Sequence, residues 1–561
     1  MTNSDIAAVL DQTADLIELT NGNPHRARAF ARAARSINDL DEEVETRLAA
    51  GTLTAVGGIG DAMADHLSEI AETGTFPLHD ELLNAIPPGL LDVLRVQGLG
   101  TKRTRRLWND LDITSLDELE QAAEEGRITS LDGFGPKTQA NILENVRRLR
   151  SYEHQWRLPD VQSAAVTLLE GLRALEAVDR AEPAGALRRD AQVLEEATVV
   201  VATHSPDLVR QWIDRHLENP EPQDDTGLTA TLPEGIPVRL HLAPPARFGT
   251  VWWRATGSDA HCASFESRHA APGDHASEAA VYESAGIPVI PPALRENKGE
   301  LEAAAADGLP TLLTVEALQG CLHNHSTFSD GSDSLSEMAE AARDLGYSYF
   351  GICDHSQSLQ IADGLSPDAV RRQHEEVQTL NAAYADEPPN FRVFHGIESD
   401  VLRDGSLDYD AEVLDLLDFV VASVHTGFNM SEAEATERVV RAVEHPHTRI
   451  LGHPTGRLLL AREGYPLDHE RVIHACAEHD VAIELNANPH RLDLDWRWVR
   501  TATEQGVLIS VNPDAHSTAE LRNVKWGVAA GRKGWLEPSD TLNAKSLPDF
   551  QAWVDAGPAS A

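Results

Sequence analysis

The stretch Gly-Cys-Leu-His-Asn-His-Ser-Thr-Phe-Ser-Asp-Gly, residues 320–331, decides the fold of the C-terminal part of the chain. After a short apolar run, it places His323 and His325 two positions apart at the predicted end of a strand. Side chains alternate between the faces of a strand, so residues i and i+2 point to the same side. Residues 514–516, Asp-Ala-His, repeat this geometry with a carboxylate. We therefore expect both motifs to contribute to one polar cluster.

Between these motifs, apolar runs of strand length alternate with helical patterns over about 240 residues. This alternation favours an α/β barrel or a layered parallel sheet. The expected strands are Tyr349–Cys353, Phe391–Glu398, Phe419–Val424, Arg449–Leu451, Ala482–Leu485 and Val507–Val511.

Nearly every histidine or carboxylate candidate follows one of these apolar runs, and the carboxyl ends of barrel strands meet on one face. A single such histidine is more often a hydrogen-bonded or surface residue, but the whole set favours a centre for two or three divalent metal ions. Mixed nitrogen and oxygen ligands suit zinc, manganese or iron. We expect Asp354 and Asp400 to have supporting or structural roles. The candidate ligands are His323, His325, Asp330, His355, Glu398, His425, His453, Asp514 and His516.

Six other histidines lack a position at a strand end, so we leave them out of the predicted centre. They are His374, His445, His447, His469, His474 and His490.

The first 150 residues indicate helices joined by short turns, and one Gly-apolar-Gly pattern occurs three times, each time before a helix. Paired glycines permit a tight turn whose backbone N–H groups can bind a phosphate at the helix N-terminus. Three copies predict helix–hairpin–helix elements, although the first, followed by Asp61, would also fit a simple capping turn. The predicted DNA contacts are Gly58, Gly60, Gly98, Gly100, Lys102, Arg103, Gly133, Gly135 and Lys137.

The composition is that of a multidomain globular protein: 561 residues, 42% of them apolar and 24% charged. It excludes a disordered chain, a collagen and a disulfide miniprotein. No window approaches the ~18 apolar residues of a membrane span, and the N-terminus lacks a signal peptide pattern. The four cysteines form no CxxC pair. We therefore expect a cytoplasmic protein that has no membrane partner.

The formal net charge of −43 argues at first against a nucleic-acid partner, since a polyanion repels another. However, only six of the 47 cationic residues are lysines. Many carboxylates with few lysines are what we expect of a halophilic protein, because molar salt shortens the Debye length to ~3 Å. The alternative is simply an acidic protein.

With these motifs in place, the C-terminal part resembles the PHP (polymerase and histidinol phosphatase) domain, a distorted (β/α)7 barrel with a multinuclear metal site. The whole chain resembles the bacterial and archaeal family X DNA polymerases (PolX). Besides the histidine motifs, the resemblance rests on residues 185–190, 256–261, 286–302, 396–409 and 526–536, together with the three glycine motifs.

The resemblance also assigns three positions to the metal-binding aspartates of the polymerase palm, and this chain departs from the family there. Glu196, Thr198 and Arg239 occupy them. Because two-metal nucleotidyl transfer needs carboxylates, we expect a palm that has kept its fold and lost its metals. Cys321, often aspartate in the family, shares a strand face with His323 and His325, so support of these ligands is expected to differ.

The resemblance implies a Mn²⁺-dependent 3′→5′ exonuclease of base excision repair, with possible endonuclease activity at abasic sites. Zn²⁺ and Fe²⁺ are alternatives to Mn²⁺. The expected partner is gapped, nicked or 3′-ended DNA, held without sequence specificity by a monomer. Alternatives are an active DNA polymerase with a proofreading PHP domain, a non-catalytic DNA-binding scaffold and a small-molecule phosphatase. The expected catalytic residues are Glu398, His323, His325 and Asp514.

The resemblance also suggests five domains, from an N-terminal helical region to the PHP domain. Their expected ranges are 1–82 (8-kDa-like, helix–hairpin–helix), 83–154 (fingers-like, helix–hairpin–helix), 155–232 (degenerate palm), 233–312 (thumb-like) and 318–561 (PHP).

Overall fold

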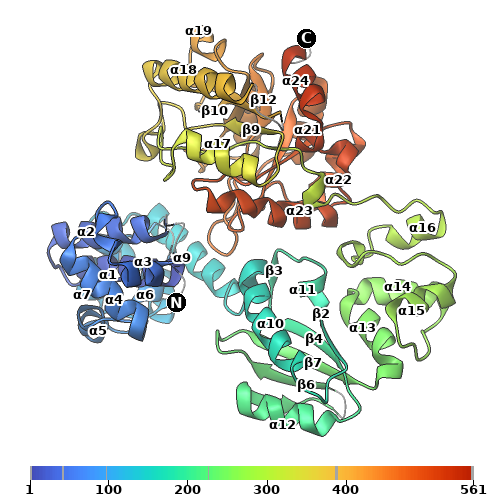
Figure 1. Cartoon of the computed structure of the whole chain (residues 1–561). Helices are drawn as coiled ribbons and strands as arrows, with labels where there is room; N and C mark the ends of the chain where they lie inside the picture. Colours follow the sequence, from blue (N-terminus) through green and yellow to red (C-terminus); the bar gives the residue numbers. More distant parts are fainter. Residues whose placement is uncertain are drawn as a thin grey trace. The chain divides into compact units, whose positions relative to one another are not determined.

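The computed structural model of the chain describes residues 3–38, 40, 43–96, 98–224, 227–385 and 390–557. It divides into two compact units, Met1–Glu153 and His154–Ala561, drawn together in Figure 1. Among the described helices, none combines the length and apolar character needed to cross a bilayer.

The first unit is helical. Two apolar cores lie along it, one centred on α1 and α2 and the other on the helices from α6 to α9. The helices are α1 Asn3–Leu19, α2 Pro24–Asn38, α3 Val44–Ala50, α4 Asp61–Thr73, α5 Pro77–Asn84, α6 Leu90–Leu94, α7 Thr101–Leu111, α8 Leu116–Glu124 and α9 Pro136–Ser151.

The second unit begins with a five-stranded sheet in the order β2-β4-β7-β6-β5, with α10 alongside it (Figure 1). Its elements are α10 Leu158–Arg173, β2 Arg180–Ala184, α11 Gly185–Arg188, β4 Ala197–Ala202, α12 Pro206–His216, β5 Glu218–Pro222, β6 Gly227–Thr231 and β7 Pro237–Ala243; β1 Trp156–Arg157 and β3 Val193–Leu194 form a separate antiparallel pair.

Strand β7 pairs with β4 and β6 inside this sheet. The expected boundary between residues 232 and 233 would therefore divide one sheet between two domains, which its hydrogen-bonded ladder does not permit. We place the boundary after Ala243. The helices that follow are α13 Phe248–Thr256, α14 Asp259–His269, α15 Glu278–Ala285 and α16 Glu300–Ala305.

The C-terminal part is a parallel seven-stranded sheet in the order β14-β13-β12-β11-β10-β9-β8. Beyond the ends of β8 and β14, a bridge between Asn324 and Ala515 brings the outer strands together, with the His325 N–H donating to the Ala515 carbonyl at 2.8 Å. The sheet is therefore a nearly closed barrel. The strands are β8 Gly320–Cys321, β9 Tyr349–Ile352, β10 Arg392–Asp400, β11 Phe419–Ser423, β12 Thr448–Leu451, β13 Ala482–Asn486 and β14 Ile509–Asn512.

Helices connect these strands. Phe550 of the last helix packs against Tyr349, Phe394 and Phe419, which lie in the N-terminal halves of their strands. That end of the barrel interior is thus filled by rings. The helices are α17 Leu335–Asp344, α18 Pro367–Tyr384, α19 Ala411–Leu414, α20 Glu432–Val443, α21 His469–Glu478, α22 Trp496–Glu504, α23 Val524–Lys533 and α24 Leu547–Ala556.

Candidate metal centre

The nine histidines and carboxylates singled out in the sequence lie together at the carboxyl ends of the barrel strands. Glu398, near the end of β10, occupies the middle of the group and is 1% exposed. Its Oε1 lies 2.9 Å from His453 Nε2, 3.1 Å from His425 Nε2 and 3.3 Å from His323 Nε2. Its Oε2 lies 2.7 Å from His355 Nδ1. One carboxylate therefore faces imidazoles from four strand ends.

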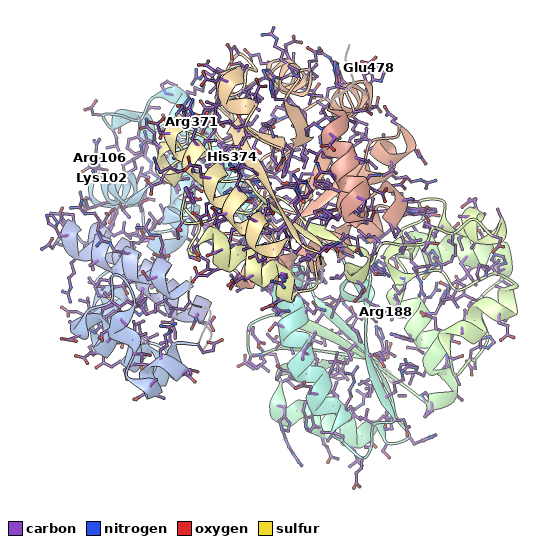
Figure 2. The ribbon with its side chains drawn as sticks, turned by 45° about the horizontal axis from the view of Figure 1, so that its top comes forward. Lys102, Arg106, Arg188, Arg371, His374 and Glu478 are labelled. Carbon is purple, nitrogen blue, oxygen red and sulfur yellow. The ribbon has the colours of Figure 1, made fainter. Side chains whose placement is uncertain are left out.

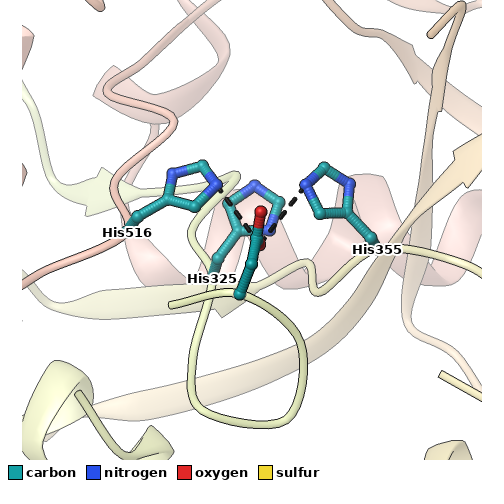
Figure 3. Close-up of side chains that lie close together, drawn as sticks. His325, His355 and His516 are labelled. Carbon is teal, nitrogen blue, oxygen red and sulfur yellow. Dashed lines mark ion pairs between the residues drawn. The ribbon is translucent and has the colours of Figure 1, made fainter. Parts of the chain in front are cut away.

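A second carboxylate, Asp330, lies on the other side of His355. Its Oδ1 is 3.5 Å from His355 Nε2 and 3.4 Å from His516 Nε2. Figure 3 shows His355, His516 and His325 grouped around a carboxylate. Burial and the neighbouring rings of His516 and His355 lower the pKa of His325 to about 3. His325 is therefore a neutral imidazole with a nitrogen lone pair available near neutral pH.

Three sets of donor atoms in this region are close enough to share an ion. Within each set, the atoms lie within 4.8 Å of one another. The sets overlap at His325 and His355, so they form one continuous cluster. They are His325, Asp330, His355 and His516; His323, His325 and Asp514; and His355, Glu398 and His425.

Several buried donor atoms of the centre have no hydrogen-bond partner among the described residues. They include His325 Nδ1 and His453 Nδ1. Buried polar atoms are normally satisfied, and an unsatisfied group calls for an explanation such as an ion. Imidazole and carboxylate donors of this kind are compatible with divalent metal ions.

Carboxylates outweigh the effect of burial on three of the histidines. Although burial opposes the charge, surrounding carboxylates, first Glu484 and then Glu398, raise the pKa of His323 well above its usual value. Burial is outweighed in the same way by Glu398 at His425 and by Asp330 at His516, and the pKa of each rises to about 9. Without an ion, these imidazoles therefore hold protons at neutral pH.

A fully buried carboxylate that the sequence analysis missed, Glu484 of β13, supports the centre. Its Oε2 lies 2.6 Å from His323 Nδ1, and it accepts hydrogen bonds from the side chains of Asn512 and Asn486 at 2.9 and 3.0 Å. Held in this way, His323 keeps its proton on Nδ1 and directs Nε2 towards Glu398. The signal for Glu484 was present, since it is an acidic residue within a short apolar strand.

Asp400 and Asp354, expected to be supporting residues, contact elements of the centre. Asp400 Oδ1 lies 3.2 Å from His425 Nδ1. Asp354 accepts hydrogen bonds from the Ser326 N–H at 2.8 Å and from the Ser329 hydroxyl at 2.5 Å. It thereby holds the turn that leads into Asp330.

The local backbone differs from the expected continuous strands. Strand β8 ends at Cys321, and His323 adopts a left-handed φ of 55°, as does Asp514 with a φ of 53°. The alternation of a regular strand therefore does not hold at the first motif. The expectation that Cys321 shares the face of the histidines was wrong: its thiol is fully buried and contacts Asn324 Oδ1 at 3.5 Å.

The three glycine motifs adopt nearly the same backbone. Gly58, Gly98 and Gly133 have φ values of 84°, 89° and 82°, a left-handed region that favours glycine. The residues between the glycine pairs are buried. Gly60, Gly100 and Gly135 are extended and precede α4, α7 and α9. Each motif thus presents the start of a helix in the same way.

The cations beside these motifs fall into two groups. Arg103 donates to the Gly98 carbonyl at 2.8 Å, and Arg106 lies 3.4 Å from Asp110. Lys102 and Lys137 are exposed and make no ion pair within the described part of the chain. Lys102 and Arg106 both lie on α7 (Figure 2). The two lysines are therefore the cations that lie open to a ligand.

The three palm positions lie side by side. Thr198 of β4 is paired with Arg239 of β7, and Arg239 donates from Nε and Nη2 to the two carboxylate oxygens of Glu196, at 2.7 and 3.0 Å. They line a cavity of about 1120 Å³. The cation of Arg239 thus neutralises the carboxylate of Glu196.

Histidines omitted from the prediction stand apart from the centre. For example, His374 lies on α18 (Figure 2), with Nδ1 3.1 Å from His395 Nδ1. Its other ring nitrogen lies 2.7 Å from the Gln378 amide.

The fold and the cluster define a PHP-type barrel, which follows a helix–hairpin–helix region in the sequence. Comparison with protein families agrees, because residues 1–76 match the helix-hairpin-helix domain, 90–148 the SAM-like helix-hairpin-helix tandem and 322–516 the PHP domain.

The chain is 33% identical over 578 residues to the DNA polymerase/3′-5′ exonuclease PolX of Bacillus subtilis (strain 168), with 99% of each chain covered. It therefore belongs to the PolX family. Part of the chain is also similar to smaller proteins. A probable phosphatase of Acetivibrio thermocellus is 28% identical over 36% of this chain and 80% of its own length. Another probable phosphatase, of Syntrophotalea carbinolica, is 30% identical over 29% of this chain and 64% of its own length.

Proposed function

We propose that the protein is a metal-dependent phosphodiesterase that removes nucleotides from DNA 3′ ends. The observation that carries this proposal is the cluster of nine ligand-type side chains, Glu398 and Asp330 among them, at the carboxyl ends of the barrel strands. The relative from Bacillus subtilis, which matches over 99% of each chain, carries a 3′-5′ exonuclease in its name beside a DNA polymerase.

Two or three divalent ions, with Mn²⁺ favoured over Zn²⁺ or Fe²⁺, would be held by the nine residues. Such ions lower the pKa of a water nucleophile and offset the charge that develops on a phosphate. Glu398, which faces four of the imidazoles, would be a central ligand. His323, His325 and Asp514 would complete the catalytic group, while Glu484 and Asp400 fix the orientation of His323 and His425. The ligand list is His323, His325, Asp330, His355, Glu398, His425, His453, Asp514 and His516.

The polymerase palm is inactive in this proposal. Three carboxylates would be needed to hold two Mg²⁺ ions, but Thr198 offers a hydroxyl and Arg239 a cation. The one remaining carboxylate, Glu196, is already paired with Arg239. The palm would then serve as a structural framework only, and the domains would be 1–82, 83–154, 155–243, 244–312 and 318–561.

The helix–hairpin–helix motifs would hold the DNA backbone without reading its sequence, since they offer backbone N–H groups and lysines rather than base contacts. The contacts would come from the glycine pairs and from Lys102, Arg103 and Lys137. We infer a monomer that acts on gapped, nicked or 3′-ended DNA in base excision repair, with endonuclease activity at abasic sites.

The charge of −43 fits a cytoplasm of high salt. In molar salt the repulsion between protein and DNA is screened, but counterion release also contributes little to binding. Affinity would then depend on short-range contacts and on the metal centre. Halophily predicts that activity and stability rise together as KCl is raised towards molar concentration.

The test is an assay on one gapped DNA with a labelled 3′ end, with Mn²⁺ and deoxynucleotides, across a salt titration. We expect 3′→5′ shortening, no primer extension, and loss of shortening in the His323→Ala/His325→Ala variant. Extension of the primer would establish the alternative, an active polymerase. Unchanged shortening in the double variant would refute the proposed site. Hydrolysis of small phosphate esters without action on DNA would instead favour a phosphatase.

A further inference from the structure

One arginine lies next to the candidate metal centre and is neither a predicted metal ligand nor a predicted DNA contact. Arg491 lies in the loop after β13, and its Nε is 3.6 Å from Asp514 Oδ2. The other oxygen of this carboxylate, Oδ1, faces His325 Nε2 at 3.0 Å. A positive charge is therefore fixed at the edge of the group His323, His325 and Asp514.

The contact with Asp514 does not satisfy this guanidinium. At 3.6 Å it is longer than a hydrogen bond, and Asp514 Oδ2 already accepts a hydrogen bond from Asn486 at 2.9 Å. Between residues 3 and 557, as far as they are described, no other acceptor contacts the Arg491 side chain, which is 21% exposed. Its N–H donors are thus available at the open side of the centre.

The guanidinium groups of two neighbouring arginines, unlike that of Arg491, are engaged in hydrogen bonds within the protein. Arg457 donates to the carbonyls of Arg491 and Leu492 and to Asp495. Arg462 donates to the Gly456 carbonyl and lies over the Phe428 ring, 4.4 Å from its centroid. Both therefore have structural contacts that Arg491 lacks.

The loop itself is held from two sides, which fixes where Arg491 points. Arg457 binds its backbone, and Gln192 of the palm accepts from Arg457 at 3.0 Å. Gln192 also donates to the Leu492 carbonyl at 3.4 Å. On the preceding residue, His490 Nε2 lies 2.8 Å from Arg157 Nη1. A preorganised loop of this kind lowers the cost of binding a ligand.

A cation beside a cluster that takes divalent ions repels those ions, so its favourable partner is an anion. We propose that Arg491 binds a non-bridging oxygen of the DNA phosphodiester that is cut, as a phosphate-binding residue of the centre. This rests on the proposed nuclease function. Guanidinium matches phosphate oxygens through two parallel hydrogen bonds, which lysine does not reproduce.

The test compares Arg491→Gln and Arg491→Lys with a matched control, Arg371→Gln, whose guanidinium is paired with Glu412 on α19 at 2.9 Å. The full-length protein is loaded with Mn²⁺. Metal affinity, inorganic phosphate binding by calorimetry, and kcat and KM on 3′-labelled DNA are measured for each variant.

We expect Arg491→Gln to lower kcat/KM about 100-fold and to weaken phosphate binding at least tenfold, with metal affinity unchanged or higher. Arg491→Lys recovers part of the loss, and Arg371→Gln has no effect. Wild-type values in Arg491→Gln, or a loss of metal from it, would overturn the inference. If the wild-type protein does not cut DNA but binds phosphate through Arg491, the nuclease proposal fails and the phosphate site stands.

Discussion

Arg239 and Glu196 form a bidentate ion pair at the positions where the palm would need carboxylates. The arginine side chain is 41% exposed and the glutamate 31%. The pair therefore contributes little stability, typically less than about 1 kcal/mol, but under the proposed assignment of the palm it places a cation where a Mg²⁺ ion would have to bind. Its main consequence is for chemistry.

The Arg239→Met variant tests this pair. We expect its free energy of unfolding to change by less than about 1 kcal/mol and its nuclease rate to match the wild type. Neither protein should extend a primer. As a positive control, Glu196→Asp/Thr198→Asp/Arg239→Asp restores three carboxylates and is expected to bind Mg²⁺ in the palm. Primer extension by the wild-type protein would contradict our account.

Glu398→Gln removes the charge that faces four imidazoles. We expect fewer bound metal ions and a nuclease rate at least about 100-fold lower, because the amide cannot bridge two cations. Metal analysis and the 3′-end assay check this. Glu478→Gln is the matched control, since Glu478 is a surface residue of α21 (Figure 2). Equal metal content in the two variants would exclude Glu398 as a ligand.

Glu484→Gln tests the support behind His323. The amide carries no negative charge, so its hydrogen bond with the His323 Nδ1–H is weaker than that of the carboxylate. The imidazole therefore binds an ion less strongly. We expect metal affinity to fall about 10- to 100-fold, and excess Mn²⁺ to restore the rate. A rate that stays low in saturating Mn²⁺ would assign Glu484 a more direct role.

The metal affinity should depend on pH. In the metal-free protein the pKa values of His425 and His516 are about 9, so both hold a proton at pH 7 and must release it when an ion binds. As pH rises from 7 to 9, affinity therefore increases, by about tenfold per pH unit for each released proton. Chelator competition at pH 7, 8 and 9 measures this. A pH-independent affinity would show that neither histidine binds the metal.

Lys102→Ala/Lys137→Ala tests the helix–hairpin–helix contacts. Each lysine that binds a phosphate adds about one to the slope of log affinity against log salt. We expect the double variant to lose about two units of slope and to bind all sequences less tightly. Lys298→Ala, at an exposed lysine of the second unit, serves as the control. The same slope in both variants would argue against these contacts.

The clustering of the nine side chains was predictable because they follow apolar runs at strand ends, and a parallel barrel brings such ends together whatever the details of the loops. His355, His425 and His453, for instance, come from three different strand ends and meet at Glu398. The helices after the glycine motifs were predictable for a similar reason, since each motif is a local signal.

Other features depend on contacts that the sequence does not encode locally. Glu484 lies within an apolar strand, and only the closure of the barrel brings it to His323, 161 positions earlier. The left-handed backbone of His323 lies next to the bridge between Asn324 and Ala515, and the loop that carries Arg491 is held by Gln192 of the palm. The boundary at residues 232 and 233 came from the family resemblance alone, and only the pairing of β7 with β4 and β6 shows that this strand belongs to the palm sheet.

The bridge between Asn324 and Ala515 makes the first and last strands of the barrel neighbours. During synthesis on the ribosome, His323 and His325 therefore emerge long before Asp514, the carboxylate that completes their group. A nascent or truncated chain that ends before residue 514 would hold the helical region and the palm, and so could engage DNA without cutting it. The order of the barrel strands thus delays hydrolytic activity until translation of the domain is almost finished.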